Sequence, residues 1–542
     1  MRILLVMPDY GKKDYYYISM GIMMVSAYLK NKGYEVHCLN QNHHSESRLQ
    51  AMLEERSFDV VATGGLFIYI SPIRAIINTV RRINPKAKVV LGGAIASADP
   101  QFISGELNPD FLVIGEAERT MDILLSALQN EKDLRQVTGI AFQDKGEFVR
   151  TKPTPLIEDL DEIPLSDYEG FEYGYYLDHF SPDTQYLCSV RGNGYKVRGV
   201  NIFSSRDCVS KCTFCFRITG GNYRTRSLKN FLEEVQYLID TYNINNIGLL
   251  DEMFITSRKR LVEWCKALKE IGLPWECQTR VTSVDSETLA LIKDSGCHLI
   301  SFGFESGSLT VLKSMRKGIT PALIEKAIQG ALKHKITIQG NFIFGDPAET
   351  FKTANETIAF TRKFPQLALG YGFIIPYPGS ELYNNLVADG KLINRKLFHE
   401  NPLHKVYNMT TLSSIAFRYL LIKVNSEGYR RRCMVYGKIL KLKKNGDAYL
   451  LVIRCHRCGG ENPDCLIDLN RRNLFIVCKH CYQRTFIDKA DIRFMNPHEI
   501  WKKLWLVYII PFMISVGIAW IYAWIYCFIR RSRASIFRDG RG

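Results

Sequence analysis

Cys208-Val-Ser-Lys-Cys-Thr-Phe-Cys215 is the stretch from which the fold and chemistry of this chain can be predicted. It places Cys208, Cys212 and Cys215 in one short loop with the spacing Cys-x3-Cys-x2-Cys. Three thiolates can hold three irons of a cubane cluster, whereas a closed iron–sulfur site takes four, so the fourth iron is open to a small molecule. The alternatives are a zinc knuckle and a chance cluster of cysteines, but zinc takes four ligands, usually from paired Cys-x2-Cys units.

The segments around this loop alternate between strand-like and helix-like patterns. The apolar run Val200–Ser204 precedes the cysteines, so they follow the C-terminal end of a strand, where barrel enzymes hold their chemistry. Helices are expected at Phe231–Asp240 and Ser257–Ile271. Further strands are expected at Ile244–Asp251, Trp275–Val281, Leu299–Glu305, Thr337–Phe344 and Tyr371–Pro376. Strands that alternate with helices predict a parallel sheet.

The cysteine loop, with the aromatic Phe214 before its last cysteine, resembles that of the radical S-adenosylmethionine (SAM) enzymes. The resemblance implies that the 4Fe-4S cluster binds SAM through its open iron and cleaves it to a 5′-deoxyadenosyl radical, chemistry that belongs to the cofactor. It also implies a partial (β/α)6 barrel over residues 196–410. An external electron donor such as ferredoxin or flavodoxin is expected.

By the same resemblance, polar residues at the expected strand ends are candidate SAM contacts. Asp251 and Glu252 stand where the family meets the methionine amino end. Arg280 could pair with the SAM carboxylate through two hydrogen bonds. Glu305 could accept hydrogen bonds from the ribose hydroxyls. No catalytic acid or base is identified.

Two turns follow the last strands of the expected barrel. Gly345-Asp-Pro-Ala-Glu349 resembles the glycine-rich turn on the adenine side of SAM, with Gly345 and Glu349 as candidate contacts. Asp346 departs from the family, in which an apolar residue is common. The second turn is Pro376-Tyr-Pro-Gly379.

Residues 1–144 form a separate predicted domain. Short strands are expected at Met1–Met7, Val36–Leu39, Val60–Thr63, Lys88–Leu91 and Phe111–Ile114. Helical segments such as Met20–Lys32 and Pro72–Ile83 lie between them, which is a doubly wound α/β pattern. No Gly-x-Gly-x-x-Gly turn follows the first strand, which argues against a dinucleotide.

Glycines just past these strands resemble the cobalamin-binding domain of cobalamin-dependent radical SAM proteins. The candidate cobalamin contacts are Gly64, Gly65, Gly92, Gly93, Gly115 and Glu116. The Asp-x-His-x-x-Gly signature, which supplies a cobalt ligand in other cobalamin proteins, is missing. His43 and His44 lack that context and are expected at a solvated surface. A domain retained only as a scaffold is the alternative.

The remaining segments extend beyond this resemblance. Residues 145–195, with prolines, acidic residues and no sustained period, are predicted to be a linker. A basic extension is expected at 411–445 and a zinc ribbon at 446–490, with strands at Tyr449–Ile453 and Leu474–Val477. Its predicted zinc ligands are Cys455, Cys458, Cys478 and Cys481. The rival is an auxiliary iron–sulfur cluster with Cys465 and His456 as extra ligands.

Residues 502–530 are predicted to attach the chain to a membrane. Leu504–Ile529 carries no charge and exceeds the roughly 20 residues that cross a bilayer. Arginines follow it, and Pro511 permits a hairpin, so a single span and a monotopic hairpin stay open. Because the cluster needs a reducing compartment, the catalytic domains are expected to face the cytoplasm.

The length and composition of the chain are consistent with several domains and with metal sites. A chain of 542 residues exceeds one hydrophobic core. Met1–Met7 is too short for a signal peptide, so fifteen cysteines favour metal ligation over disulfides. The net charge of +16 is expected to meet anionic lipid rather than nucleic acid.

The sequence thus predicts a membrane-attached, cobalamin-dependent radical SAM enzyme that methylates an unactivated carbon of a lipid or other membrane-linked small molecule. Radical cyclisation or rearrangement is the enzymatic alternative. A binding component with vestigial cofactor sites is the non-catalytic one.

Overall fold

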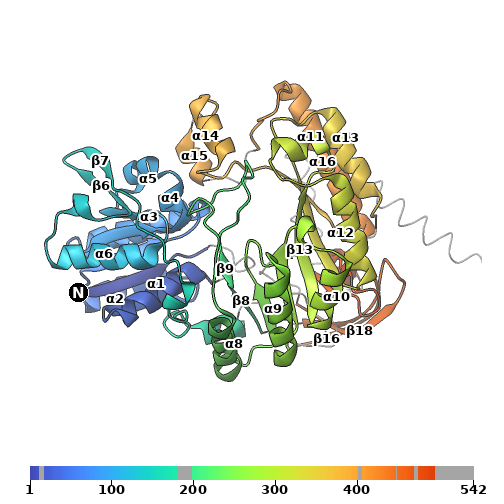
Figure 1. Cartoon of the computed structure of the whole chain (residues 1–542), viewed down its shortest axis with the longest axis horizontal. Coiled ribbons are helices and arrows are strands. Elements are labelled where there is room, and N and C mark those ends of the chain that lie inside the picture. The colour runs from blue at the N-terminus through green and yellow to red at the C-terminus, as the bar shows by residue number, and fades with distance from the viewer. Residues whose placement is uncertain are drawn as a thin grey trace, which may run out of the picture. The chain divides into compact units, whose positions relative to one another are not determined.

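The computed structural model has an α/β architecture, and it describes residues 1–10, 18–179, 198–365, 367–392, 394–400, 406–446, 448–468 and 474–494 (Figure 1). The chain divides into two compact units. Unit 1 comprises Met1–Tyr186, Arg198–Phe254 and Ile375–Val406. Unit 2 comprises Leu187–Val197, Ile255–Ile374 and Tyr407–Gly542.

Unit 1 contains a seven-stranded sheet of order β2-β1-β3-β4-β5-β6-β7. Its strands are β1 (Arg2–Met7), β2 (Glu35–Asn40), β3 (Val60–Gly64), β4 (Lys88–Gly92), β5 (Phe111–Val113), β6 (Ile140–Asp144) and β7 (Glu147–Arg150). The first five are parallel and the last two antiparallel. Because β1 lies between β2 and β3 and is covered on both faces, its run from Ile3 to Met7 is fully buried, at most 1% exposed.

Helices complete the predicted doubly wound domain. They are α1 (Met20–Asn31), α2 (Glu46–Glu55), α3 (Ile70–Ile83), α4 (Gly93–Ala98), α5 (Pro100–Leu107) and α6 (Ala117–Gln129). Helix α1 packs with α6, and α2 packs with α3, as expected for helices that cover two faces of one sheet. This confirms the predicted fold of the domain.

The predicted linker is more structured than its composition indicates. The sheet continues past residue 144 through β7, so the first domain extends to Arg150. Helix α7 (Tyr173–His179) then follows, and aromatic side chains bury themselves around it, among them Tyr168, Phe171 and Tyr176. Large rings recover enough buried area to order a segment that lacks a regular period.

The rest of unit 1 holds the first part of the barrel. Its elements are β8 (Gly199–Ile202), β9 (Ser205–Arg206), β10 (Arg224–Thr225), α8 (Leu228–Tyr242), β11 (Asn246–Leu249), α14 (Glu381–Ala388) and α15 (Arg395–Glu400). Strands β8 and β11 are parallel, and β9 and β10 form a short antiparallel ribbon.

Unit 2 continues the strand–helix alternation. Its strands β12 (Trp275–Thr279), β13 (Cys297–Glu305), β14 (Thr337–Phe344) and β15 (Gly370–Phe373) pair in parallel in chain order. Its helices are α9 (Arg258–Ile271), α10 (Ser286–Asp294), α11 (Leu309–Ser314), α12 (Pro321–Lys333) and α13 (Phe351–Arg362). All six predicted barrel strands are therefore present.

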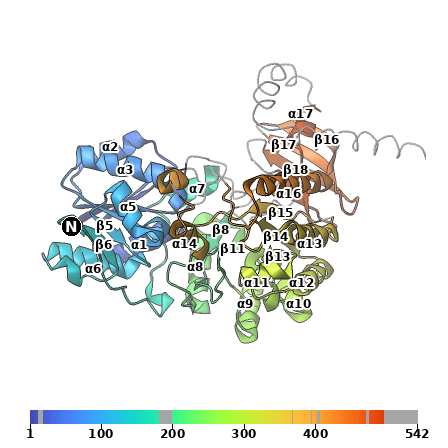
Figure 2. The same ribbon diagram turned by 90° about the horizontal axis from the view of Figure 1, so that it is seen from above.

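The C-terminal part of unit 2 differs from the predicted basic extension. Residues 411–445 contain the long helix α16 (Ser414–Met434), because Phe417, Leu420 and Val424 recur on one helical face and are buried. Strands follow in an antiparallel sheet, β16 (Lys438–Asn445), β17 (Ala448–Arg454) and β18 (Glu461–Asp468), and a hairpin, β19 (Phe475–Val477) and β20 (Arg484–Phe486), before α17 (Lys489–Phe494). Figure 2 shows α16 beside β15.

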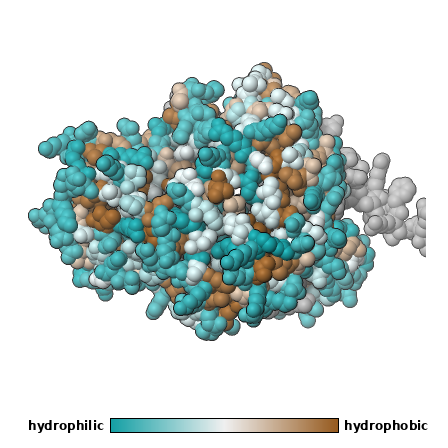
Figure 3. Space-filling model, in the orientation of Figure 1, coloured by the Kyte–Doolittle hydropathy of each residue, from teal (hydrophilic) through white to brown (hydrophobic). Residues whose placement is uncertain are grey.

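Within the described ranges, no helix is both long and apolar enough to cross a membrane. The predicted membrane segment, Leu504–Ile529, lies outside those ranges. On the face drawn in Figure 3, hydrophobic residues form small groups among hydrophilic ones. Membrane attachment thus stays a prediction that rests on the apolar segment alone.

Candidate functional site

The three cysteines of the predicted cluster lie in the loop between β9 and β10, just past the C-terminal end of β8. Cys212 is buried, Cys208 half-buried and Cys215 exposed. The loop is fixed from within, since the Cys215 amide donates to the Cys212 carbonyl at 3.3 Å and the Arg217 guanidinium donates to the Ser210 carbonyl. The structure therefore places the loop where the sequence predicts it.

A turn from far along the chain also holds this loop. The Leu382 amide donates to the Thr213 carbonyl at 3.2 Å. Gly379, in the predicted Pro-Tyr-Pro-Gly turn, has φ +81°, and a Cβ there would lie 2.5 Å from the Phe216 ring. Only glycine accepts both the left-handed backbone and this close approach. No sequence pattern predicted this contact.

A cavity of about 400 Å³ in unit 1 is lined by every predicted cobalamin contact. These are Gly64, Gly65, Gly92, Gly93, Gly115 and Glu116. The barrel side of the same cavity includes Phe203, Asp207 and Glu252. The glycine loops at the carboxyl edge of the first sheet therefore face the strand that leads into the cysteine loop.

The glycines are needed because the loops nearly touch. A Cβ on Gly64 would lie 2.5 Å from the Gly92 carbonyl oxygen, and a Cβ on Gly93 would lie 3.0 Å from the Gly65 amide. Gly115, with φ +85°, instead has open space beside it. One wall of the cavity is therefore backbone without side chains, and apolar strand residues such as Val90 and Val113 surround it. Such a wall fits a large flat cofactor such as a corrin.

Glu116 is turned toward the base of the cysteine loop. Its carboxylate accepts two hydrogen bonds from Arg224, at 2.6 and 3.0 Å, and pairs with Arg206 at 3.1 Å. Arg206 also donates to Glu118 at 2.6 Å. Burial alone would raise the pKa of Glu116, but the Arg224 hydrogen bond and both guanidinium charges outweigh it and lower that pKa. Glu116 thus joins the glycine loop to the β9–β10 ribbon.

Asp251 and Glu252, a predicted pair, have different surroundings. Asp251 is fully buried and accepts hydrogen bonds from the amides of Ser204, at 2.6 Å, and Ser205, at 2.9 Å. It ties the end of β11 to the end of β8. Glu252 instead lines the cavity, where burial and then the Asp207 charge raise its pKa. Glu252 is the member of the pair that faces open space.

Asp207 is a cavity residue that the sequence did not reveal. It lies directly before Cys208 with φ +70°, a conformation uncommon outside glycine and often found at functional sites. Its carboxylate is 3.9 Å from Arg224. A single aspartate beside a cysteine carries no pattern, so only the fold could identify it.

In unit 2, the predicted SAM contacts Arg280 and Glu305 meet at one lysine. Lys317 forms an ion pair with Glu305 at 2.8 Å, and the Arg280 guanidinium donates to the Lys317 carbonyl. Glu305 ends β13 with φ +63°. The structure brings these two strand ends together, and their contact with SAM stays a prediction.

The Gly345–Glu349 turn is held by its own carboxylate. Gly345 has φ +92°, and its amide donates to Glu349 at 3.4 Å. Glu349 also accepts from the Thr353 hydroxyl at 2.5 Å, which fixes the turn to the start of α13. Glu349 is 1% exposed, and burial raises its pKa to about 7. Its visible role is to shape the turn.

The two histidines do not line the cavity. His43 and His44 both pair with Glu172, at 3.1 and 2.8 Å. The expectation of a solvated surface fails for His43, whose side chain is fully buried and lies 4.8 Å from the Tyr175 ring. Burial by this aromatic segment lowers the pKa of His43.

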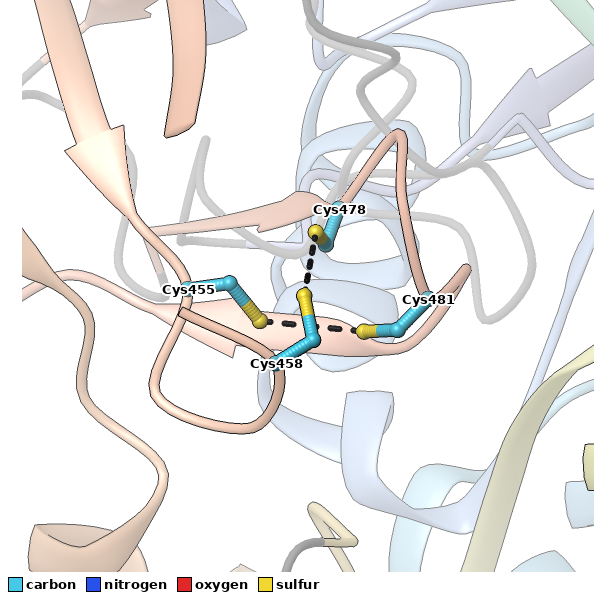
Figure 4. A group of neighbouring side chains, drawn as sticks. All are labelled: Cys455, Cys458, Cys478 and Cys481. Atoms are coloured by element: carbon cyan, nitrogen blue, oxygen red, sulfur yellow. Dashed lines mark hydrogen bonds between the residues drawn. The ribbon is translucent and has the colours of Figure 1, made fainter. Parts of the chain in front are cut away.

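The four C-terminal cysteines form a candidate metal site. Their sulfurs lie within 4.8 Å of one another, and Figure 4 shows the two knuckles pointing at each other. Two opposite sulfur pairs, Cys455–Cys481 and Cys458–Cys478, are 3.7 and 3.6 Å apart. Four thiolates around one ion with bonds of about 2.3 Å would be about 3.8 Å apart, so the site has the size of a tetrahedral ion. Cys465 instead packs in the apolar core of this small domain.

Comparisons with known proteins agree with both cofactor regions. Residues 11–125 match the B12 binding domain, and residues 202–361 match the radical SAM superfamily. The chain is 30% identical over 339 residues to an uncharacterized methyltransferase of Pyrococcus horikoshii, covering 61% of this chain and 70% of that protein.

A second relative and a solved structure are similar over most of the chain. The anaerobic magnesium-protoporphyrin IX monomethyl ester cyclase of Rubrivivax gelatinosus is 26% identical over 404 residues, 71% of this chain and 70% of that protein. The structure of the radical SAM methyltransferase TsrM from Kitasatospora setae, with cobalamin and a [4Fe-4S] cluster bound, has a TM-score of 0.58 at 19% identity. That match covers 72% of this chain and 75% of TsrM and indicates a shared fold.

Proposed function

Because this chain belongs to the cobalamin-dependent radical SAM enzymes, with a 4Fe-4S cluster, SAM and cobalamin as cofactors, we propose that it transfers a methyl group to an unactivated carbon. The observation that carries the proposal is the cavity of unit 1. Its wall combines the glycine loops with Asp207, the neighbour of Cys208. A corrin held there would lie beside the cysteine loop.

The chain's own residues would hold and orient the cofactors. When bound, the cluster supplies the electron that cleaves SAM, and cobalamin supplies a carrier for a methyl group. Cys208, Cys212 and Cys215 would ligate the cluster. Glu116, through Arg206 and Arg224, fixes the spacing between the glycine loops and the β9–β10 ribbon that brackets the cysteine loop.

The products of SAM distinguish methylation from other radical reactions. A methyltransferase consumes one SAM for 5′-deoxyadenosine and a second as methyl donor, which leaves S-adenosylhomocysteine. Protein reconstituted anaerobically with cobalamin, and then given SAM and a reductant, should therefore form both products. Formation of 5′-deoxyadenosine alone would contradict methyl transfer, and formation of neither would support a non-catalytic binding component.

Radical cyclisation is a second candidate function. It is favoured by the similarity to the Rubrivivax cyclase, which extends over 71% of this chain. A cyclase needs the radical from SAM but no methyl donor. It therefore predicts 5′-deoxyadenosine without S-adenosylhomocysteine in the same assay.

The apolar segment Leu504–Ile529 supports attachment to a membrane and a lipid or membrane-linked substrate. An uncharged segment of this length gains free energy when it is buried in lipid. Ending the chain at Asn496, beyond α17, should release the protein from membranes with its cluster intact. A full-length protein that stays in the soluble fraction would contradict this attachment.

The C-terminal cysteine site supports zinc as its ion. Zinc accepts four thiolates in a closed tetrahedron, and such sites are structural because no coordination position is left open. The spacing of the sulfurs agrees with this geometry. Metal analysis should find one zinc per chain, and additional iron that is lost with Cys478→Ser would indicate an auxiliary cluster instead.

A further inference from the structure

Unit 2 contains a second cavity, of about 330 Å³, between β14, β15, α16 and the hairpin strand β20. It lies at the edge of the barrel strands, where α16 packs beside β15 (Figure 2). It shares no residue with the cavity of the glycine loops. Neither the sequence motifs nor the proposed cofactors account for it.

The lining of this cavity is rich in cations. Arg431, Arg432 and Arg484 all line it, together with Gln339, Asn341 and Asn425. None of the described residues that line it is an aspartate or a glutamate. Three guanidinium groups and three amides make a lining that favours an anion.

Two of the arginines are only partly satisfied by protein groups. Arg431 is 4% exposed and donates to the carbonyls of Thr361, Phe364 and Leu367. Arg484 donates to Ala368 at 3.1 Å. Among the described residues, the Nε atoms of both arginines are buried without a hydrogen-bond partner. A buried donor that stays unpaired is unfavourable, and a bound acceptor would satisfy it.

Among the described residues, no ion pair joins a carboxylate to the three lining arginines. Glu427 forms its ion pairs with Arg362 and Arg430, outside the cavity. Glu276 raises the pKa of Arg484 through its charge, but it faces His298 at 3.4 Å and is not part of the lining. Burial is the larger influence and lowers the pKa of Arg484 to about 10. The guanidinium is still charged near neutrality, without a carboxylate in the cavity.

The cavity also reaches the inner face of the barrel strands. Along β14, Ile338, Phe342 and Phe344 are buried on one face, where Phe342 contacts Phe360 of α13. Asn341 is on the opposite face and is exposed. Because side chains alternate along a strand, Gln339 shares the face of Asn341. This is the face turned away from the covering helix.

We propose that this arginine-lined cavity binds the phosphate or carboxylate group of an anionic ligand. The inference goes beyond the proposed function, because none of the predicted cofactor contacts belongs to this lining. Arg432, exposed and at the cavity, is placed to meet the anion first, and the buried Arg431 and Arg484 supply inner donors. The same chemistry would recognise a free anion or the phosphate of a lipid headgroup.

Inorganic pyrophosphate is the probe for a free anion, titrated calorimetrically into the full-length protein. Saturable binding is expected, and Arg432→Gln should weaken it about tenfold or more, as for loss of a charge-assisted hydrogen bond. Arg430→Gln is the matched control. It removes the same charge two positions away, from a residue that pairs with Glu427 and does not line the cavity.

Vesicles of phosphatidylcholine, with and without phosphatidic acid, test a lipid headgroup as the source. Stronger binding of Arg430→Gln than of Arg432→Gln to the phosphatidic acid vesicles alone would identify the headgroup. Equal behaviour of the two variants toward both probes would overturn the proposal. Formation of 5′-deoxyadenosine by the unaltered protein is measured in parallel, because its absence would contradict the proposed function without contradicting the anion site.

Discussion

The carboxylate of Glu116 and the guanidinium of Arg224 form a two-pronged ion pair, with distances of 2.6 and 3.0 Å. Glu116 directly follows Gly115, the last glycine that lines the cavity of unit 1. Arg224 belongs to the β9–β10 ribbon that brackets the cysteine loop. The Arg224 side chain is 5% exposed and also donates to the Ile157 carbonyl at 2.7 Å. This pair links the two predicted cofactor regions within unit 1.

Glu116→Gln should destabilise unit 1 and weaken retention of cobalamin. The change removes the negative charge that the buried guanidinium groups of Arg206 and Arg224 pair with. Breaking a buried ion pair in this way lowers the free energy of unfolding by about 3 kcal/mol or more. Thermal unfolding and the corrinoid content after gel filtration measure the effect. Glu147→Gln, at an exposed position of β7, is the control. Equal stability and equal corrinoid content in both variants would contradict the structural role of the pair.

Gly64→Ala should abolish cobalamin binding. The new Cβ would lie 2.5 Å from the Gly92 carbonyl oxygen, so the two glycine loops must separate. Gly105→Ala is a matched control, because nothing lies within 4 Å of its added Cβ and alanine favours its helix. Absorbance of bound hydroxocobalamin reports the result. Retention of the corrinoid by the Gly64 variant would show that the loops are not its site.

Glu349→Gln should change the pH dependence of stability. The folded pKa of about 7 lies above the unfolded value of 4.5, so the native state loses stability as pH rises from about 4.5 to 7. The difference between the two pKa values corresponds to a loss of about 3 kcal/mol. Glutamine does not titrate, so the variant avoids this loss and should be the more stable protein at pH 8. Melting temperatures of both proteins between pH 5 and 8 test this. A difference that stays constant with pH would exclude titration of Glu349 as its cause.

Removal of the C-terminal metal should loosen only the small domain around it. Cys478→Ser should lose one metal ion per chain, because its sulfur lies 3.6 Å from that of Cys458 in the four-cysteine site. The cluster at Cys208–Cys215 should retain its iron. Cys465→Ser is the matched control, since Cys465 packs in the core and is not one of the four clustered cysteines. Equal metal loss from both variants would indicate unfolding rather than ligation.

The sequence predicted the features that depend on local patterns. Buried parallel strands are continuous apolar runs, so Met1–Met7 and Thr337–Phe344 were located closely. Cysteine spacing predicted both thiolate sites. The helix α16 was missed because its polar side chains, Arg431 among them, obscure a buried face.

Other features arise only from contacts between distant residues. The partner of Glu116 is Arg224, 108 positions away, and no local pattern shows that the two meet. Asp251 could equally have faced a cofactor, but the fold buries it against Ser204. Contacts between distant residues therefore decide which of several similar carboxylates face the cavity. In this chain the carboxylates of Glu252 and Asp207 line it.

Reductive cleavage of SAM by the reconstituted protein tests the central claim most directly. The unaltered chain, loaded anaerobically with iron and sulfide, should bind a 4Fe-4S cluster and form 5′-deoxyadenosine when reduced. Cys212→Ala should lose both, and Cys265→Ala, which changes a buried cysteine outside the loop, should retain both. Formation of 5′-deoxyadenosine by Cys212→Ala at the rate of the unaltered protein would contradict the assignment of the cysteine loop.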